Sequence, residues 1–456
     1  MKFIRKDIMK LALPILTEQV FVISMGTINT MMAGHIGKEA VSAIGMVDSL
    51  NFIFISFFSA LAVGGTVVVA QFVGQGNIKK ANAAMKQALY SGFLISFLVT
   101  IITWTLRVPI INGLFGSADS LVIKNTILYL GITLLTYPLI SIDLVANGIL
   151  RGAGDTKTPM MITIFMNFIN IIFSYLFIYG INIHNEHFNI VLQGMGIKGA
   201  ALGIALARTI GAIIILFVLL RGSRIIKLTK ILKFKLDKEL LKPIFNVGIP
   251  ASLESLLFNL GKLITQIFIV SMGTVTIASN AISGSIAGMI NIPGNAFSIA
   301  ATAIVGQLMG RRKFKEAENS LRYLVFFSSV CLGIIGLLTA PFAKSICSLY
   351  STNIDVINLS AKLMVINAVF VLFWPFSFVL PSGFKGAGDV KYTLATSIIG
   401  MWVFRITLGY LLGISLKLGL VGVWLGMYTD WLVRGALYYI RLKNGKWKNH
   451  SVIENT

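Results

Sequence analysis

The sequence predicts an all-α polytopic membrane protein, with twelve transmembrane helices in two six-helix bundles related by pseudo-twofold symmetry. Three observations predict this fold class: an apolar composition, twelve apolar stretches of spanning length, and an internal repeat. Apolar residues make up 56% of the chain, charged residues make up only 12%, and the mean hydropathy is +0.84. Because soluble domains carry roughly 25% charged residues, this composition indicates an integral membrane protein.

Each apolar stretch is long enough to cross about 30 Å of hydrocarbon as an α-helix. We expect the twelve spans at residues 11–34, 43–73, 84–112, 121–149, 159–181, 199–220, 243–271, 277–309, 320–348, 355–383, 392–415 and 419–441. The first stretch contains Glu18 and runs past the length of a signal peptide. It is therefore expected to remain in the protein as the first transmembrane helix.

Four short motifs occur twice, in the same order along the chain. The pairs are LPILTE (13–18) and IPASLE (249–254), QFVG (71–74) and QLMG (307–310), LRGAGDTK (150–157) and FKGAGDVK (384–391), and GIKGAALG (196–203) and GLVGVWLG (419–426). The first two pairs are separated by 236 residues, the third by 234 and the fourth by 223. These offsets indicate two homologous halves, which are typical of secondary transporters whose site lies between the repeats.

Each half holds six predicted helices, and an even number gives both halves the same orientation in the membrane. We expect an N-terminal bundle at 1–221, a cytoplasmic linker at 222–242 and a C-terminal bundle at 243–456. The shorter offset of the last motif pair predicts an extracellular insertion at 182–192. His184 and His187 lie in this insertion, and we expect a solvated loop there rather than a metal site.

The net charge is +22, and its distribution fits a membrane rather than a nucleic acid. If the N-terminus is cytoplasmic, 28 Lys and Arg residues flank the spans on the cytoplasmic side and 7 on the opposite side. This bias satisfies the positive-inside rule. We therefore expect a multi-pass protein of the cell membrane with both termini cytoplasmic. Anionic lipid head groups are the expected partners of the basic segments, and no nucleic-acid partner is expected.

Two further features exclude classes of function. The segment GQGNIKK (74–80) lacks the full phosphate-loop pattern and follows no predicted strand. We therefore expect no ATP-driven step, no enzymatic activity and no cofactor. Cys331 and Cys347 are 16 residues apart on one predicted helix, or about 24 Å, so they cannot form a disulfide.

Ionisable residues inside the predicted spans are the main candidates for a site, because each costs at least a few kcal/mol and usually marks an ion or substrate path. The acids are Glu18, Asp48, Asp143, Glu254 and Asp430, and the bases are Arg208, Lys262, Arg405 and Arg434. We interpret four of these as structural: Asp48, Asp430, Arg208 and Arg405. Asp143 corresponds to Ser377 in the repeat, which allows a role in one half only; the alternative is a carboxylate paired with Arg208 or with a backbone group.

Glu18 and Glu254 are the strongest pair because they occupy the same repeat position, each four residues after a proline. A carboxylate in an apolar lumen is suited to hold a proton, a sodium ion or a cationic compound in turn. Sodium would bind Glu254 transiently, and no resident metal is expected. The alternative for both acids is a structural carboxylate tied to a neighbouring helix.

Polar amides and one lysine complete the candidate site. Such amides coordinate sodium, hydrogen-bond a ligand or join helices. The candidates are Asn29, Asn167 and Asn170 in the N-terminal half, and Lys262, Gln266 and Asn280 in the C-terminal half. Lys262 lies about 12 Å along the helix from Glu254, so we expect it to set the local potential rather than bond that acid.

The segments ALP (12–14) and NTMMAGHIGKEAVSAIG (29–45), with the doubled RGAGDTK and KGAGDVK, resemble the multidrug and toxic compound extrusion (MATE) family. The resemblance covers nearly the whole chain. It implies two bundles around a cleft that alternates between outward- and inward-facing states. It also implies export of cationic, often aromatic compounds in exchange for Na⁺ or H⁺ as the coupling ion.

The resemblance extends to one family acid and departs from three others. Glu254 matches the acid often present in the seventh helix. Asn29 stands where the first helix often has Asp, Ser174 stands where many members have Asp four residues after Asn170, and the tenth-helix acid is absent near 374–377. The resemblance therefore implies that Glu254 and Glu18, with Asp143, couple the ions.

We therefore expect a secondary active multidrug efflux antiporter that exports cationic or aromatic compounds by alternating access and acts as a monomer. One alternative is a flippase or exporter of a lipid-linked or metabolite substrate in the same wider superfamily. Another is a channel or receptor, which would not alternate between two faces and would leave the duplicated carboxylates unexplained.

Overall fold

The computed structural model describes residues 5–34, 36–116, 118–185, 188–229 and 235–453. The N-terminal bundle consists of α1 (Arg5–Gly34), α2 (Lys38–Gln75), α3 (Ile78–Phe115), α4 (Ser120–Leu134), α5 (Tyr137–Gly152), α6 (Lys157–Tyr179) and α7 (Ile197–Arg221). The C-terminal bundle consists of α8 (Lys238–Ser271), α9 (Thr274–Ile290), α10 (Ile292–Gly310), α11 (Phe314–Thr339), α12 (Ala343–Ser348), α13 (Ile354–Phe370), α14 (Trp374–Ala387), α15 (Val390–Ile398), α16 (Thr407–Tyr410) and α17 (Gly419–Asn444). Short 3₁₀ or π segments join or follow some of these helices: η1 (Val371–Phe373), η2 (Ile399–Ile406), η3 (Leu411–Ser415) and η4 (Lys446–Asn449).

The twelve-helix membrane fold predicted from the sequence is confirmed. In the described part of the chain, ten helical segments are long and apolar enough to span a membrane. The pair α4 and α5, bent by 50° at a short break, adds the eleventh. The twelfth is α17, a 26-residue helix that carries a buried acid and a buried base. The predicted span at 277–309 is divided at Asn291 into α9 and α10.

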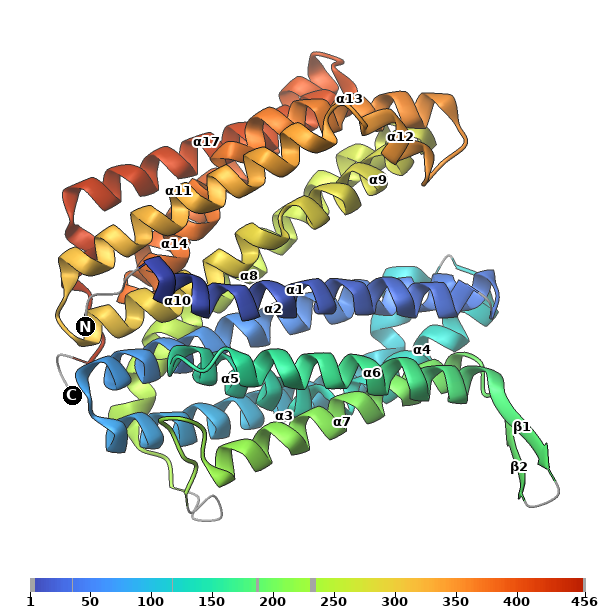
Figure 1. The fold of residues 1–456 in the computed structure, drawn as a ribbon. Coiled ribbons are helices and arrows are strands. Elements are labelled where there is room, and N and C mark those ends of the chain that lie inside the picture. The colour runs from blue at the N-terminus through green and yellow to red at the C-terminus, as the bar shows by residue number, and fades with distance from the viewer. Residues whose placement is uncertain (1–4, 35, 117, 186–187, 230–234, 454–456) are drawn as a thin grey trace.

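The two bundles meet at the end of the molecule that carries both termini and diverge toward the opposite end (Figure 1). We call these the terminal end and the hairpin end, since β1 and β2 project from the latter. Helix α2 of the first bundle packs along α8 and α10 of the second, and α1 also packs against α10. A small apolar cluster of Val67, Val247, Ala251 and Val390 fills part of this contact.

The repeated motifs form the contact at the terminal end. Gly74 of α2 lies against the backbone of Gln307, and its repeat partner Gly310 of α10 lies against the backbone of Gln71. A Cβ at either glycine would collide with the opposite carbonyl oxygen. The two glutamines also cross between the halves: Gln71 Nε2 donates to the Gly386 carbonyl at 3.1 Å, and Gln307 Nε2 donates to the Gly152 carbonyl at 2.8 Å. The doubled QFVG and GAGD motifs thus hold the bundles together pseudo-symmetrically.

The predicted insertion at 182–192 is not an irregular loop. Strand β1 (Gly180–Asn185) pairs antiparallel with β2 (Phe188–Gln193), and His184 pairs with Asn189 in this ladder. We expected a solvated loop here, although Ile181, Asn182, Ile183 and His184 alternate apolar and polar side chains as in a strand. His187 lies outside the described residues.

Candidate ion and substrate sites

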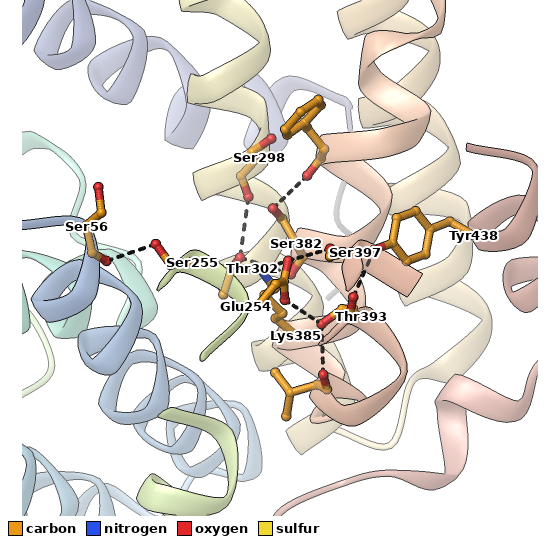
Figure 2. A network of polar contacts seen from close by, with 12 residues as sticks. Ser56, Glu254, Ser255, Ser298, Thr302, Ser382, Lys385, Thr393, Ser397 and Tyr438 are labelled. Atoms are coloured by element: carbon orange, nitrogen blue, oxygen red, sulfur yellow. Dashed lines mark hydrogen bonds and ion pairs between the residues drawn. The ribbon is translucent and has the colours of Figure 1, made fainter. Parts of the chain in front are cut away.

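Glu254 lies on α8 at the centre of a polar network (Figure 2). Lys385 Nζ, from the last turn of α14, lies 2.9 Å from Glu254 Oε1. Ser397 donates a hydrogen bond to the same oxygen at 3.0 Å, and Thr393 donates to Oε2 at 3.0 Å. The Tyr438 hydroxyl of α17 lies 3.2 Å from Ser397 Oγ and donates to the Thr393 carbonyl. Glu254 is therefore a neutralised, hydrogen-bonded carboxylate rather than an isolated one.

Glu18 on α1 sits in an equivalent arrangement in the other bundle. Arg151, from the last turn of α5, forms an ion pair with Glu18 Oε1. Thr163 of α6 donates to the same oxygen at 3.4 Å. The offset of 234 residues that relates Arg151 to Lys385 also relates Thr163 to Ser397. Each bundle therefore places an acid from its first helix, a base from the end of its fourth span and a hydroxyl from its fifth at one point.

The two clusters differ in how well their oxygens are satisfied. Three oxygen atoms near Glu18 are buried without a hydrogen-bond partner in the described part of the chain: Glu18 Oε2, Asp143 Oδ1 and Asn147 Oδ1. Asp143 lies beside Asn147 and interacts electrostatically with both Glu18 and Arg151. The repeat equivalents of Asp143 and Asn147 are Ser377 and Pro381, so the C-terminal bundle lacks this feature. Two acids thus share one base around unpaired oxygens in the N-terminal bundle.

The asparagines of α1 and α6 form a separate contact. Asn170 Nδ2 donates to Asn29 Oδ1 at 2.7 Å, and Ser174 donates to Asn170 Oδ1 at 3.3 Å. Asn167, one turn before Asn170, is buried, and both polar atoms of its amide have no partner among the described residues. The Asn29–Asn170 pair joins two helices with neutral groups, where the resemblance implied acids in other family members.

The interlobe cavity has a volume of about 460 Å³ and is lined by residues of both bundles. Phe52, Ser56 and Val63 come from α2, whereas Glu254, Lys385 and Arg434 come from the C-terminal bundle. Ser255 Oγ bonds across it to the Ser56 carbonyl at 3.4 Å (Figure 2). Glu254 is therefore placed where a solute held between the bundles can contact it.

The C-lobe cavity, of about 440 Å³, lies beside the interlobe cavity, because Phe258, Phe378 and Asn295 line both. All its lining residues belong to the C-terminal bundle. They include the predicted candidates Lys262, Gln266 and Asn280. Asn280 Nδ2 donates to Gln266 Oε1 at 3.2 Å and accepts from Trp424 Nε1 at 3.0 Å.

The remaining charges inside the spans have protein partners. Arg434 bonds Asp430 through two nitrogens, at 2.5 and 2.9 Å, and Arg405 lies 4.0 Å from the same acid. Arg208 donates to Thr136 at 3.1 Å and interacts electrostatically with Asp48. Asp143 lies with Arg151, so the alternative pairing with Arg208 is not the arrangement observed.

The bases of both clusters were missed as site residues. From the sequence, Arg151 and Lys385 were predicted to be basic residues that flank the spans on the cytoplasmic side, where such residues are common. Their side chains instead turn inward to the acids. The repeat carried the missing signal, because an acid and a base recur together with nearly equal offsets of 236 and 234 residues.

Two bundles joined at one end, with a buried carboxylate–base pair in each and a cavity between them, define a two-lobed membrane transporter. It is a transporter and not an enzyme. The MatE family model matches residues 14–176 and 250–411, once in each bundle. The chain therefore belongs to the multidrug and toxic compound extrusion family.

Curated relatives align over nearly the whole chain. The uncharacterized transporter YisQ of Bacillus subtilis is 26% identical, covering 97% of this chain and 94% of that protein. The probable multidrug resistance protein NorM of Thermotoga maritima is also 26% identical, covering 99% and 94%.

Solved structures share the fold at lower identity. A MOP superfamily transporter from Pyrococcus furiosus matches with a TM-score of 0.87 at 21% identity, covering 96% of this chain and 95% of that one. An outward-facing multidrug resistance MATE transporter matches with a TM-score of 0.85 at 21% identity, covering 97% and 96%.

Proposed function

We propose that this transporter is a secondary active multidrug antiporter that exports cationic or aromatic compounds in exchange for Na⁺ or H⁺ by alternating access. The observation that carries this proposal is the pair of buried carboxylate–base clusters, one in each bundle. The relatives named as probable multidrug resistance proteins support the substrate range. An ionisable group held at membrane depth usually serves an ion or substrate path.

The N-terminal cluster is the proposed coupling site. It offers two carboxylate oxygens and one amide oxygen, all buried and unpaired among the described residues. Oxygen ligands of this kind suit a hard cation such as Na⁺, and a proton would equally relieve the repulsion between Glu18 and Asp143. Either ion would restore charge balance to two acids that share Arg151.

The interlobe cavity is the proposed contact for a cationic compound. Lys385 neutralises Glu254 in this structure. A cation can therefore bind Glu254 only when Lys385 moves away. A cationic compound thus competes with Lys385 for Glu254, while the coupling ion binds the N-terminal cluster. Moving one charge across the membrane is worth about 2.3 kcal/mol per 100 mV, and exchange of a monovalent drug for one entering cation cancels this electrical term.

The proposed orientation places the terminal end in the cytoplasm of a cell-membrane protein. The charge bias across the predicted spans supports it. The bundles at 1–221 and 243–456 are the proposed moving units, with 222–242 as their linker. We propose a monomer as the working unit, because one chain contains both homologous halves of the transporter.

The second candidate is export of a lipid-linked or metabolite substrate. One observation favours it: Lys262 and Arg405 line the C-lobe cavity, a positive charge that a cationic drug would not require. For the Pyrococcus furiosus MOP superfamily transporter, reverse polarity of the binding pocket suggests a different function.

Ethidium efflux from proteoliposomes tests the proposed function. Liposomes loaded with ethidium are given Na⁺ and H⁺ gradients separately, with wild type and Glu254→Gln. We expect one gradient to drive efflux and Glu254→Gln to abolish it. Efflux in Glu254→Gln at the wild-type rate would contradict the assigned drug contact, and no efflux under either gradient would favour the second candidate. Trans-stimulated exchange would exclude a channel, which cannot support counterflow.

A further inference from the structure

The C-lobe cavity contains hydrogen-bond donors that no acceptor satisfies. Arg405 Nε and Trp431 Nε1 are buried without a partner in the described part of the chain, and both residues line the cavity. Lys262 lines it as well and forms no ion pair among the described residues. A buried donor without an acceptor is destabilising, and more so when it is charged. The unpaired donors indicate that an acceptor is supplied from outside the chain.

The charges around the cavity do not balance. Among the described residues, no Asp or Glu lines it. Asp430, the acid beside Arg405, is engaged by Arg434 through two hydrogen bonds, whereas Arg405 approaches it only to 4.0 Å. Lys262 and Arg405 therefore leave the cavity with an excess of positive charge at membrane depth, where such charge is unfavourable unless it serves a path or a ligand.

Aromatic rings surround these cations and partly compensate their burial. The ring of Phe258 has three cations near its centroid: Lys262 at 5.1 Å, Arg434 at 5.3 Å and Arg405 at 5.9 Å. A ring face attracts a cation, but more weakly than a full counter-ion does. Trp374 and Phe378 stack at 4.3 Å along the cavity and offer a flat apolar wall.

The volume leaves room for a small organic molecule. About 440 Å³ falls within the usual range of roughly 300–1,000 Å³ for ligand cavities. Gly284 and Gly288 of α9 line it, and no atom lies within 4 Å of a Cβ placed on either glycine. The cavity therefore has unfilled space beside its cationic wall.

We propose that the C-lobe cavity binds a soluble aromatic organic anion. Its carboxylate would lie between Lys262 and Arg405, and its ring against the flat apolar wall of Trp374 and Phe378. Trp431 Nε1 is placed to donate a further hydrogen bond to the same group. The site names a substrate class for the proposed transporter, and in that respect alone it rests on the proposed function. Binding in detergent needs neither an ion gradient nor transport.

Three isosteric probes test the charge preference: 2-naphthoate, 2-naphthamide and 2-naphthylmethylammonium. Their affinities for the full-length protein in a neutral detergent are measured by titration calorimetry. We expect the carboxylate to bind about tenfold or more tightly than the neutral amide, and the ammonium to bind most weakly. Equal or tighter binding of the ammonium would overturn the proposal, whatever the outcome of the ethidium assay.

Two variants locate the binding site. Lys262→Met is expected to weaken naphthoate binding about tenfold, because it removes one of the two cations placed to hold the carboxylate. Gly288→Leu, at a position where a Cβ meets no atom within 4 Å, is expected to occupy part of the cavity and to abolish binding of naphthoate. Unchanged affinity in both variants, with the thermal midpoint at or above that of wild type, would place the anion elsewhere.

An anionic lipid carries the same chemistry, so the titration is repeated with added phosphatidylglycerol. Naphthoate that binds saturably and keeps its affinity at equimolar lipid supports the soluble anion. The proposal would be overturned if the lipid displaced naphthoate from wild type and still bound Gly288→Leu as tightly. That result would indicate a lipid head-group site on a different surface.

Discussion

At the scale of single residues, each half of the chain buries one carboxylate with one base, and the two pairs differ in their surroundings. The Glu18 side chain is 3% exposed and the Glu254 side chain 12%. Glu254 accepts two further hydrogen bonds at 3.0 Å, whereas Oε2 of Glu18 accepts none from the described residues. The N-terminal pair therefore depends more strongly on its base.

Removal of that base tests the dependence. We expect Arg151→Gln to destabilise the protein by about 3 kcal/mol, because it leaves two acids in one buried cluster without a counter-charge. Thermal unfolding in detergent measures the effect. The double variant Glu18→Gln with Arg151→Gln should recover part of the loss, since it leaves one acid, Asp143, rather than two without a counter-charge.

Lys385→Gln is the matched control in the other bundle. Its effect should be smaller, because Thr393 and Ser397 still satisfy Glu254 and the pair is more exposed. If Lys385→Gln were as damaging as Arg151→Gln, or the double variant gave no recovery, the difference between the two clusters would be refuted.

At the scale of elements, glycines decide how closely helices of the two bundles approach. Gly74→Val places a side chain against the backbone carbonyl of Gln307. Because backbone cannot yield as a side chain can, we expect α2 and α10 to separate at the terminal end. The accessibility of an engineered cysteine at position 70, buried in wild type, measures this separation.

Gly45→Ala, on the same helix, is the control substitution. No atom lies within 4 Å of a Cβ at Gly45, so no change in accessibility is expected. The role assigned to the repeated QFVG motif fails if Gly74→Val leaves position 70 as protected as in Gly45→Ala.

Elements were predictable to the extent that one pattern governs them. The spans follow from apolar length and the bundle symmetry from the repeat. The bend between α4 and α5 and the division at Asn291 each lie just before a proline in the first turn of the next helix, Pro138 or Pro293, a local signal that apolar length does not report. Arg151 and Lys385 were assigned to the flanks because hydropathy does not say where a long side chain points. The unpaired donors at Arg405 and Trp431 likewise depend on contacts between distant helices.

At the scale of the whole molecule, the bundles are joined at one end by two equivalent hydrogen bonds and separated at the other. Gln71 additionally accepts hydrogen bonds from Ser451 and from the backbone N–H of Val452, so the C-terminal segment reinforces one side. Alternating access requires this end to open. Each hydrogen bond between the bundles stabilises the closed terminal end by about 1 kcal/mol. Binding of an ion or a substrate can offset a free-energy difference of this size.

Loss of both glutamines should therefore shift the population toward opening at the terminal end. In Gln71→Ala with Gln307→Ala, we expect spin labels at positions 114 and 349, near the hairpin end, to show a new shorter distance. Both positions are exposed in this structure. An unchanged distance distribution, with cysteine accessibility at position 70 also unchanged, would contradict a role for these bonds in holding the bundles.

The central claim is that the cluster of Glu18, Asp143 and Arg151 carries the coupling ion. The most direct test is substrate efflux from proteoliposomes under a Na⁺ or an H⁺ gradient, compared with gradient-free exchange in the same vesicles. Efflux of both ethidium and naphthoate is measured for wild type, Glu18→Gln and Asp143→Asn. The account predicts that both variants lose the gradient-driven component and retain exchange. Gradient-driven efflux at the wild-type rate in Glu18→Gln would contradict it.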